Sequence, residues 1–112
     1  MIDPFDKRML NAMVDKCNKL ILICDKHSKT EIQNNFILGD AILYEFEKLY
    51  EDSTRLSLET LISFPKPQIG ALRAIRNRVA HNYESVSLDL LFDIINKDIP
   101  ILKQLLIDIL KE

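Results

Sequence analysis

The stretch from Arg76 to Tyr83 combines residue types that RNA cleavage can use. It reads Arg-Asn-Arg-Val-Ala-His-Asn-Tyr, with an arginine and a histidine five positions apart and a tyrosine two positions after the histidine. Arginine stays charged and binds phosphate through two parallel donors, whereas an imidazole with an ordinary pKa of about 6.5 transfers protons near neutral pH. The pattern Arg-Asn-x-x-x-His-x-Tyr arises by chance on the order of once in several thousand such sequences. Arg76 and His81 are therefore the candidate catalytic pair.

A helix over this stretch would sort its residues into two arcs, at about 100° per residue. The apolar arc, which would face a core, contains Leu72, Ile75, Val79 and Tyr83. The polar arc beside it contains Arg73, Arg76, Asn77, Ala80 and His81. Arg76 and His81 would then border a shallow groove, with a cation on one rim and an imidazole on the other. The simpler interpretation is a surface ion pair for Arg76 and a hydrogen-bonded boundary position for His81.

Positive charge gathers around this stretch in a chain that is acidic as a whole. The formal charge is −2 and the pI is near 5.7, which excludes a protein that coats nucleic acid by bulk electrostatics. From Thr60 to Tyr83 there is no acidic residue, yet the cations Lys66, Arg73, Arg76 and Arg78 are present. We expect a short RNA contact in which Arg73, Asn77 and Arg78 support the catalytic pair. A solvated basic face is the alternative.

Composition and periodicity predict one all-α domain over residues 1–112, with about four to five helices. Only two glycines and four prolines interrupt 112 residues, of which 47% are hydrophobic. A chain of this length has room for a single core. The first helix is expected from Pro4 to about His27, with an apolar stripe of Phe5, Met9, Met13, Cys17, Leu20 and Cys24.

The remaining helices are assigned from caps and breakers. A Ser28–Glu31 capping box predicts a second helix to about residue 50, with an apolar stripe of Ile32, Phe36, Leu43, Phe46 and Tyr50. Within it, Gly39 indicates a close backbone approach or a tolerated residue. A connector over residues 52–65 is expected to hold a short helix at 58–62. A third long helix should run from Pro67 to about residue 83, and the next should begin after Ser87. Pro100 is expected to break or kink this run before a last helix.

The cysteines indicate whether a metal is bound, and the N-terminal segment indicates where the protein is located in the cell. Cys17 and Cys24 are expected to be buried free thiols. His27 follows Cys24 by three residues, but this spacing matches no compact zinc pattern, so we expect no structural metal and no cofactor. The N-terminal residues lack the features of a signal peptide, and no segment approaches about 18 uninterrupted apolar residues. We therefore expect a cytoplasmic protein with no membrane contact.

The chain resembles the HepT type of HEPN-domain protein, the toxin half of a toxin–antitoxin pair. The segment 76–83 fits the family's R-x4-H-x-Y signature. Leu38-Gly39-Asp40-Ala41 is similar to its Gly-acidic-Ala step, and Asp98-Ile99-Pro100-Ile101-Leu102-Lys103-Gln104-Leu105 is similar to its C-terminal helix. Two features depart from the pattern, because no tryptophan precedes the motif helix and Asn82 replaces a common glycine.

This resemblance implies an up-down helical bundle that pairs as a homodimer, in which two motif helices form a composite endoribonuclease site that needs no metal. His81 would deprotonate a ribose 2′-hydroxyl or protonate the leaving 5′-oxygen, while Arg76 stabilises charge on the phosphate and Asn77 orients the imidazole or binds phosphate. It further implies that a partner, a minimal nucleotidyltransferase acting as antitoxin, adenylylates Tyr83. The alternative is a non-catalytic subunit that binds substrate or nucleotide for a nucleotidyltransferase.

Overall fold

Three long helices form the body of the protein, as the computed structural model shows for residues 2–64, 70, 73–74, 76–77 and 88–112. The helices are α1 (Pro4–Lys26), α2 (Lys29–Gln33), α3 (Phe36–Thr54), α4 (Leu58–Ile62) and α6 (Leu88–Leu110). Residues 70, 73–74 and 76–77 are also helical, and these described ranges contain no strand. The prediction of an all-α fold is confirmed.

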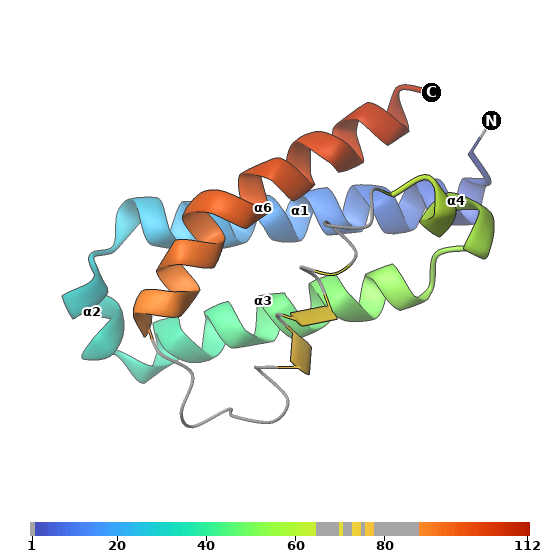
Figure 1. Ribbon diagram of the computed structural model, residues 1–112. Helices are drawn as coiled ribbons and strands as arrows, with labels where there is room; N and C mark the ends of the chain where they lie inside the picture. The colour runs from blue at the N-terminus through green and yellow to red at the C-terminus, as the bar shows by residue number, and fades with distance from the viewer. Residues whose placement is uncertain (1, 65–69, 71–72, 75, 78–87) are drawn as a thin grey trace.

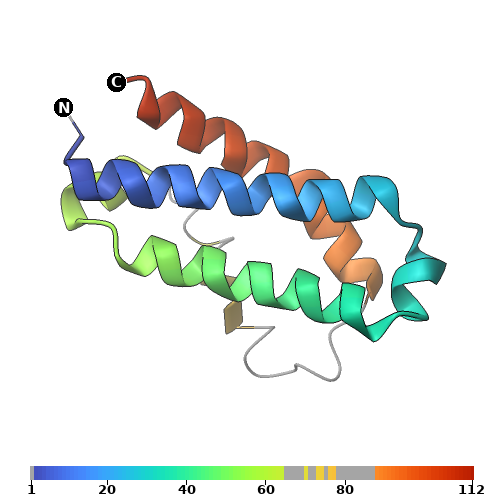
Figure 2. The same cartoon turned by 180° about the vertical axis from the view of Figure 1, so that it is seen from behind.

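Helix α1 lies at the centre of the packing, because it contacts both α3 and α6. Both partners run opposite in direction to α1, which gives the expected up-down arrangement (Figure 1). Seen from behind, the short α2 joins α1 to α3 at one end of the body, and the two chain ends lie together at the other (Figure 2). Helix α4 lies at this second end, beside the start of α1.

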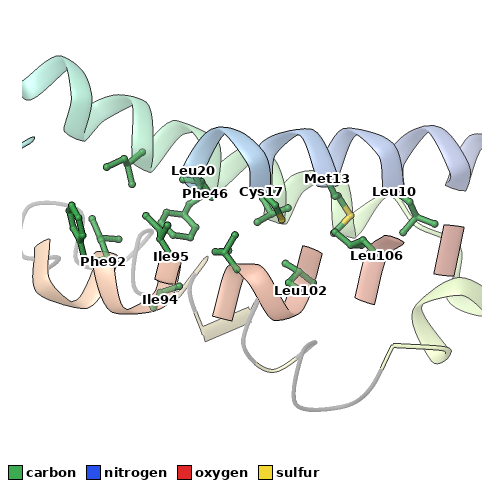
Figure 3. Close-up of a cluster of buried hydrophobic side chains, with 14 of the residues drawn as sticks. Leu10, Met13, Cys17, Leu20, Phe46, Phe92, Ile94, Ile95, Leu102 and Leu106 are labelled. Atoms are coloured by element: carbon green, nitrogen blue, oxygen red, sulfur yellow. The ribbon is translucent and has the colours of Figure 1, made fainter. Parts of the chain in front are cut away.

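The core lies between the facing stripes of the long helices (Figure 3). The stripe of α1 consists of Leu10, Met13, Cys17 and Leu20, which are all 0% exposed. The opposing side chains come from α3 (Ile42, Phe46, Leu49) and from α6 (Leu91, Phe92, Ile94, Ile95, Ile99, Leu102, Leu106, Ile109). Spacings of three and four residues place each set on one side of its helix. Each fully buried aliphatic or aromatic side chain contributes about 1.5–3 kcal/mol relative to an exposed one.

The expected stripe of α1 is correct at its centre and wrong at its start. Phe5 is 42% exposed, while Leu10, absent from the expected stripe, is fully buried. Phe5 lies about 140° round the helix from Leu10, so both cannot face the same core. The Phe5 ring instead contacts the Arg8 guanidinium, 5.7 Å from its centroid. Met9 is only partly buried.

The start of α2 follows the predicted capping chemistry, whereas α1 begins at Pro4 as expected but with a cap at Asp3 that was not predicted. Asp3 caps α1 by accepting hydrogen bonds from the backbone N–H groups of Phe5 and Asp6, and Pro4 occupies the first turn. The capping box is present: Ser28 Oγ accepts from Glu31 N–H at 3.1 Å, and Glu31 Oε1 accepts from Ser28 N–H at 3.3 Å. These caps satisfy N–H groups that a helix start leaves unpaired.

The second predicted helix is in fact two helices. Helix α2 ends at Gln33, and α3 begins only at Phe36. Asn35 caps α3 because its side-chain Oδ1 accepts a hydrogen bond from the Ile37 N–H at 3.1 Å, a local bond that competes with continued helix. Phe36, expected on an apolar stripe, is 77% exposed. The short helix expected at 58–62 is confirmed as α4.

Two expected irregularities have different outcomes. A Cβ added to Gly39 would meet no atom within 4 Å among the described residues, so no backbone approaches there and the glycine is a tolerated residue. Pro100 lies inside α6, which continues to Leu110, and the separate last helix predicted after it is wrong. Packing of the buried residues on both sides of Pro100 outweighs the proline penalty of about 3 kcal/mol. The expected start at Pro67 and the cap at Ser87 lie outside the described residues.

Candidate active site

The residues predicted to cleave RNA are divided between described and undescribed parts of the chain. Arg73, Arg76 and Asn77 are helical and exposed. Arg78, His81 and Tyr83 lie outside the described residues. The predicted grouping of Arg76 with His81 therefore stays a prediction, and the site is built here from Arg76 and its surroundings.

Arg76 packs against α3 through an aromatic ring. The carbon at the centre of its guanidinium lies 5.0 Å from the centroid of the Tyr50 ring. This is within the roughly 6 Å at which a cation over a ring face gains energy from the ring quadrupole. One guanidinium nitrogen of Arg76 also donates to Asn77 Oδ1 at 3.5 Å, the outer limit of a hydrogen bond. Tyr50 thus brings this guanidinium into contact with α3.

A hollow of about 420 Å³ lies beside this contact. Its lining comes from about two turns of α3 together with the motif arginine, namely Glu47, Tyr50, Glu51, Thr54 and Arg76. The Glu51 carboxylate is already occupied, because Lys48 Nζ lies 3.3 Å and Arg55 Nη2 lies 2.9 Å from its oxygens. Within the part of the chain that the structure describes, Arg76 forms no ion pair with a carboxylate. Its charge remains available to an anionic ligand.

A second pocket, of about 430 Å³, lies at the end of the bundle where the chain ends meet. It is lined by Ile2, Asp3, Pro4, Asp6, Ser57, Glu59, Thr60, Ser63, Ile109 and Glu112. Four of these residues are acidic and none is basic. A phosphate would be repelled there, so this pocket is not a candidate for RNA binding.

Asp6 accounts for the polar character of this second pocket. It is 1% exposed, and its carboxylate accepts hydrogen bonds from Ser57 N–H at 3.0 Å, Ser57 Oγ at 2.5 Å and Thr60 Oγ1 at 2.6 Å. Burial opposes the charge, but the bonds from Ser57 and Thr60 outweigh it, so the pKa of Asp6 lies below its ordinary value. The cluster joins α1 to α4 and has a structural role.

Cys17 is a buried free thiol as expected, whereas Cys24 is only partly buried. Burial raises the pKa of Cys17 to about 12 and that of the partly buried Cys24 to about 11. His27 Nδ1 lies 3.0 Å from Glu31 Oε2, the carboxylate of the capping box. Among the described residues, no three His, Cys, Asp or Glu side chains are placed to hold a metal ion.

The all-helical bundle and its exposed Arg73 and Arg76 are consistent with a helical domain of the HEPN type. Residues 13–109 match the model of the family described as Ribonuclease HepT-like, and the chain belongs to this family. The match begins within α1 and spans α2, α3, α4, the motif segment and nearly all of α6. No solved structure gives a significant match. Among the described helices, none is long and apolar enough to cross a membrane.

Sequence reasoning did not identify Tyr50 as a partner of Arg76. Its spacing from Phe46 and Leu43 placed it on the apolar stripe of α3. One signal was available, since Tyr50 is flanked by Glu47, Lys48 and Glu51, and an aromatic ring among charged residues suits the border of a polar site.

Proposed function

We propose that this protein is a metal-independent endoribonuclease and the toxin of a toxin–antitoxin pair. Its membership of the HepT-like ribonuclease family supports the reaction class. We propose Arg76 and His81 as catalytic residues and Arg73, Asn77 and Arg78 as residues that bind or orient the RNA. The whole of residues 1–112 would act as a single domain.

In the proposed reaction the ribose 2′-oxygen attacks the adjacent phosphorus. The new bond joins the 2′-oxygen to phosphorus, the bond from phosphorus to the 5′-oxygen breaks, and a 2′,3′-cyclic phosphate and a 5′-hydroxyl result. One imidazole accepts the 2′-hydroxyl proton, and a second donates a proton to the leaving 5′-oxygen. Arg76 stabilises the charge that grows on the phosphate oxygens, so the reaction requires no metal ion.

The observation that carries this proposal is the state of the Arg76 guanidinium. It is exposed, it is fixed by an aromatic ring, and no carboxylate of the described residues neutralises it. A structural arginine on a surface would ordinarily pair with one of the nearby carboxylates, here Glu47 or Glu51. Glu51 instead pairs with Lys48 and Arg55, and among the described residues neither Glu47 nor another carboxylate forms an ion pair with Arg76, which leaves its donors free to form a bidentate contact with phosphate.

We further propose that two copies assemble to supply two imidazoles to one site. The other histidine of the chain, His27, follows α1 and pairs with Glu31 near the start of α3. Tyr50 and Arg76 lie near the other end of α3, and the rise from Phe36 to Tyr50 is about 21 Å. His27 is therefore too remote to act with Arg76. Exposed apolar side chains, among them Leu58 and Ile62 at 73% each, are consistent with a surface that a second copy covers.

Regulation is proposed to occur at Tyr83 through a minimal nucleotidyltransferase partner. Transfer of an adenylyl group from ATP to the phenol oxygen would release pyrophosphate and leave a phosphodiester-linked nucleotide near the motif arginines. The added negative charge and the bulk of the nucleotide would compete with RNA for these arginines.

RNA cleavage by the purified chain tests the proposal. The parent should cut RNA in the presence of EDTA and leave cyclic phosphate and 5′-hydroxyl ends, which mass spectrometry identifies. Arg76→Ala and His81→Ala should each lower the rate at least about 100-fold, the scale of losing one electrostatic or proton-transfer group. Both variants should keep the helical circular dichroism of the parent.

The control and the alternative function follow from the same assay. Lys111→Ala changes a cation at the end of the chain and should leave the rate unchanged. RNA or nucleotide binding without any cleavage would favour the second function, a non-catalytic binding subunit of a nucleotidyltransferase. Parental rates in a folded Arg76→Ala or His81→Ala variant would show that the catalytic assignment is wrong.

A further inference from the structure

The contact between Arg76 and Tyr50 joins two segments that are distant in sequence. Among the ring contacts of the described residues, those of Arg8 with Phe5 and of Lys48 with Tyr44 connect neighbours on a single helix. Such pairs meet because helix geometry brings residues three or four apart together. Arg76 and Tyr50 are 26 positions apart and have the shortest of the four distances, 5.0 Å. Tertiary packing, and not local geometry, creates this contact.

An aromatic partner fixes an arginine in a different way from a carboxylate. A carboxylate occupies the N–H donors of a guanidinium and cancels its charge, whereas a ring engages the flat face and leaves the donors at the edge unoccupied. Among the described residues, Arg76 has one such edge contact, the 3.5 Å bond to Asn77 Oδ1. The remaining donors can therefore meet a phosphate while the ring restricts the rotamers of the side chain.

The surroundings of Tyr50 match this role. The ring is half-buried on α3, while the guanidinium that it holds is exposed at the hollow beside Glu47 and Glu51. Glu51 is bound by two other cations, and Glu47, which also lines the hollow, forms no ion pair with Arg76 among the described residues. A fixed ring beside an otherwise free guanidinium orients the cation and preserves its charge.

We propose that Tyr50 is the positioning residue of the ribonuclease site, which holds the Arg76 guanidinium in the orientation that binds the scissile phosphate. This inference rests on the proposed catalytic role of Arg76. Tyr50 acts through Arg76 and needs no contact with RNA. The ring face is the feature required, and the phenol hydroxyl is not.

Three variants of α3 test the proposal. Tyr50→Leu removes the ring face and should lower the single-turnover cleavage rate about threefold to thirtyfold, the range that corresponds to the energy of a cation–π contact. Tyr50→Phe keeps the ring and should cleave within about twofold of the parent. Tyr44→Leu is the matched control, because Tyr44 is 58% exposed on the same helix and contacts Lys48, so its cleavage rate should not change.

A binding measurement separates positioning from a purely structural role. RNA with 2′-O-methyl groups cannot be cleaved, so its Kd can be measured for every variant. Tyr50→Leu should weaken binding about threefold to thirtyfold in the parent, yet have no effect when Arg76→Ala is already present. Equal weakening in both backgrounds would overturn the proposal, because the effect would then not pass through Arg76. Tyr50→Met, which fills the space without a ring, gives the same test if the leucine variant folds poorly.

The outcomes distinguish this inference from the proposed function. If Arg76→Ala is inactive while Tyr50→Leu cleaves at the parental rate, Tyr50 does not position Arg76 and the proposed function stands. If the parent does not cleave RNA at all, the proposed function fails, and the binding cycle still decides whether Tyr50 orients Arg76 towards phosphate.

Discussion

Substitution of Asp6 by alanine should destabilise the protein through the junction of α1 with α4. The carboxylate is 1% exposed and accepts hydrogen bonds from Ser57 N–H, Ser57 Oγ and Thr60 Oγ1. A buried donor left without a partner costs about 1–3 kcal/mol, and bonds to a charged acceptor are at the upper end of the usual range. The two hydroxyls can rotate towards water or towards each other, since their oxygens lie 3.3 Å apart, but the Ser57 N–H cannot. We therefore expect a loss of about 2–4 kcal/mol in the free energy of unfolding.

The same cluster predicts how stability depends on pH. Because the folded state lowers the pKa of Asp6, the folded state binds fewer protons than the unfolded state in the acidic range. The contribution of Asp6 is therefore fully present above the unfolded pKa of about 3.9 and is lost as the pH falls through the lower, folded pKa. Asp6→Asn should remove this part of the acid dependence while it preserves the shape of the side chain.

Urea unfolding followed by circular dichroism measures both the loss of stability in Asp6→Ala and the acid dependence of stability in Asp6→Asn. A loss of about 2–4 kcal/mol corresponds to a decrease in Tm on the order of 10–20 °C for a domain of this size. Asp15→Ala is the matched control, because Asp15 is an exposed aspartate of α1 paired with Lys19 and should change stability by less than about 0.5 kcal/mol. A loss below about 1 kcal/mol for Asp6→Ala, or an Asn variant with unchanged acid dependence, would refute the reasoning.

Four further predictions follow from the helices and the motif. Gly39→Ala should raise the free energy of unfolding by about 0.5–1 kcal/mol in urea titrations, because the added Cβ meets no described atom; destabilisation would indicate an undetected contact. Pro100→Ala should raise the free energy of unfolding by about 1–3 kcal/mol, because it restores an N–H donor to α6. A lower free energy of unfolding would mean that the packing of α6 depends on the proline. Iodoacetamide should modify Cys24 slowly and Cys17 only after unfolding, because burial raises the pKa of both thiols. Mass spectrometry can follow the labelling, and rapid modification of Cys17 in the native protein would contradict this prediction. Tyr83→Phe should remain an active ribonuclease that the partner nucleotidyltransferase and ATP no longer silence, and an adduct on another tyrosine would contradict the assignment.

The sequence alone predicts the helices best where the signals are local. The Ser28–Glu31 capping box and the short helix at 58–62 depend on neighbouring residues, and both are present in the structure. The division between α2 and α3 was missed because Asn35 can either continue a helix or cap one, and tertiary packing decides between the two. At Pro100 the local penalty indicated a break, but burial on both sides keeps α6 continuous.

Contacts between distant residues account for what the sequence could not predict. The helix dipole alone is enough to explain why a carboxylate such as Asp6 occurs in a first helical turn. Nothing near Asp6 in the sequence therefore indicates its hydrogen bonds with Ser57 and Thr60. Tyr50 likewise fits an apolar stripe until its contact with Arg76 is seen. The motif itself is read directly from residue types and spacing, which is why Arg76 was identified as a candidate without a structure. Its pairing with His81 stays a prediction.

The nearness of the two chain ends has a consequence for the connectivity of the bundle. Ile2 and Glu112 line the same pocket, at the end of the body where α1 begins and α6 finishes (Figure 1). A linker of about six residues reaches up to roughly 20 Å, which is enough to join these ends in a circular permutant. New ends placed between α2 and α3 would leave each long helix whole. The three-helix body should then form from a chain whose helices occur in a different covalent order, because its packing depends on which faces meet and not on which helix comes first.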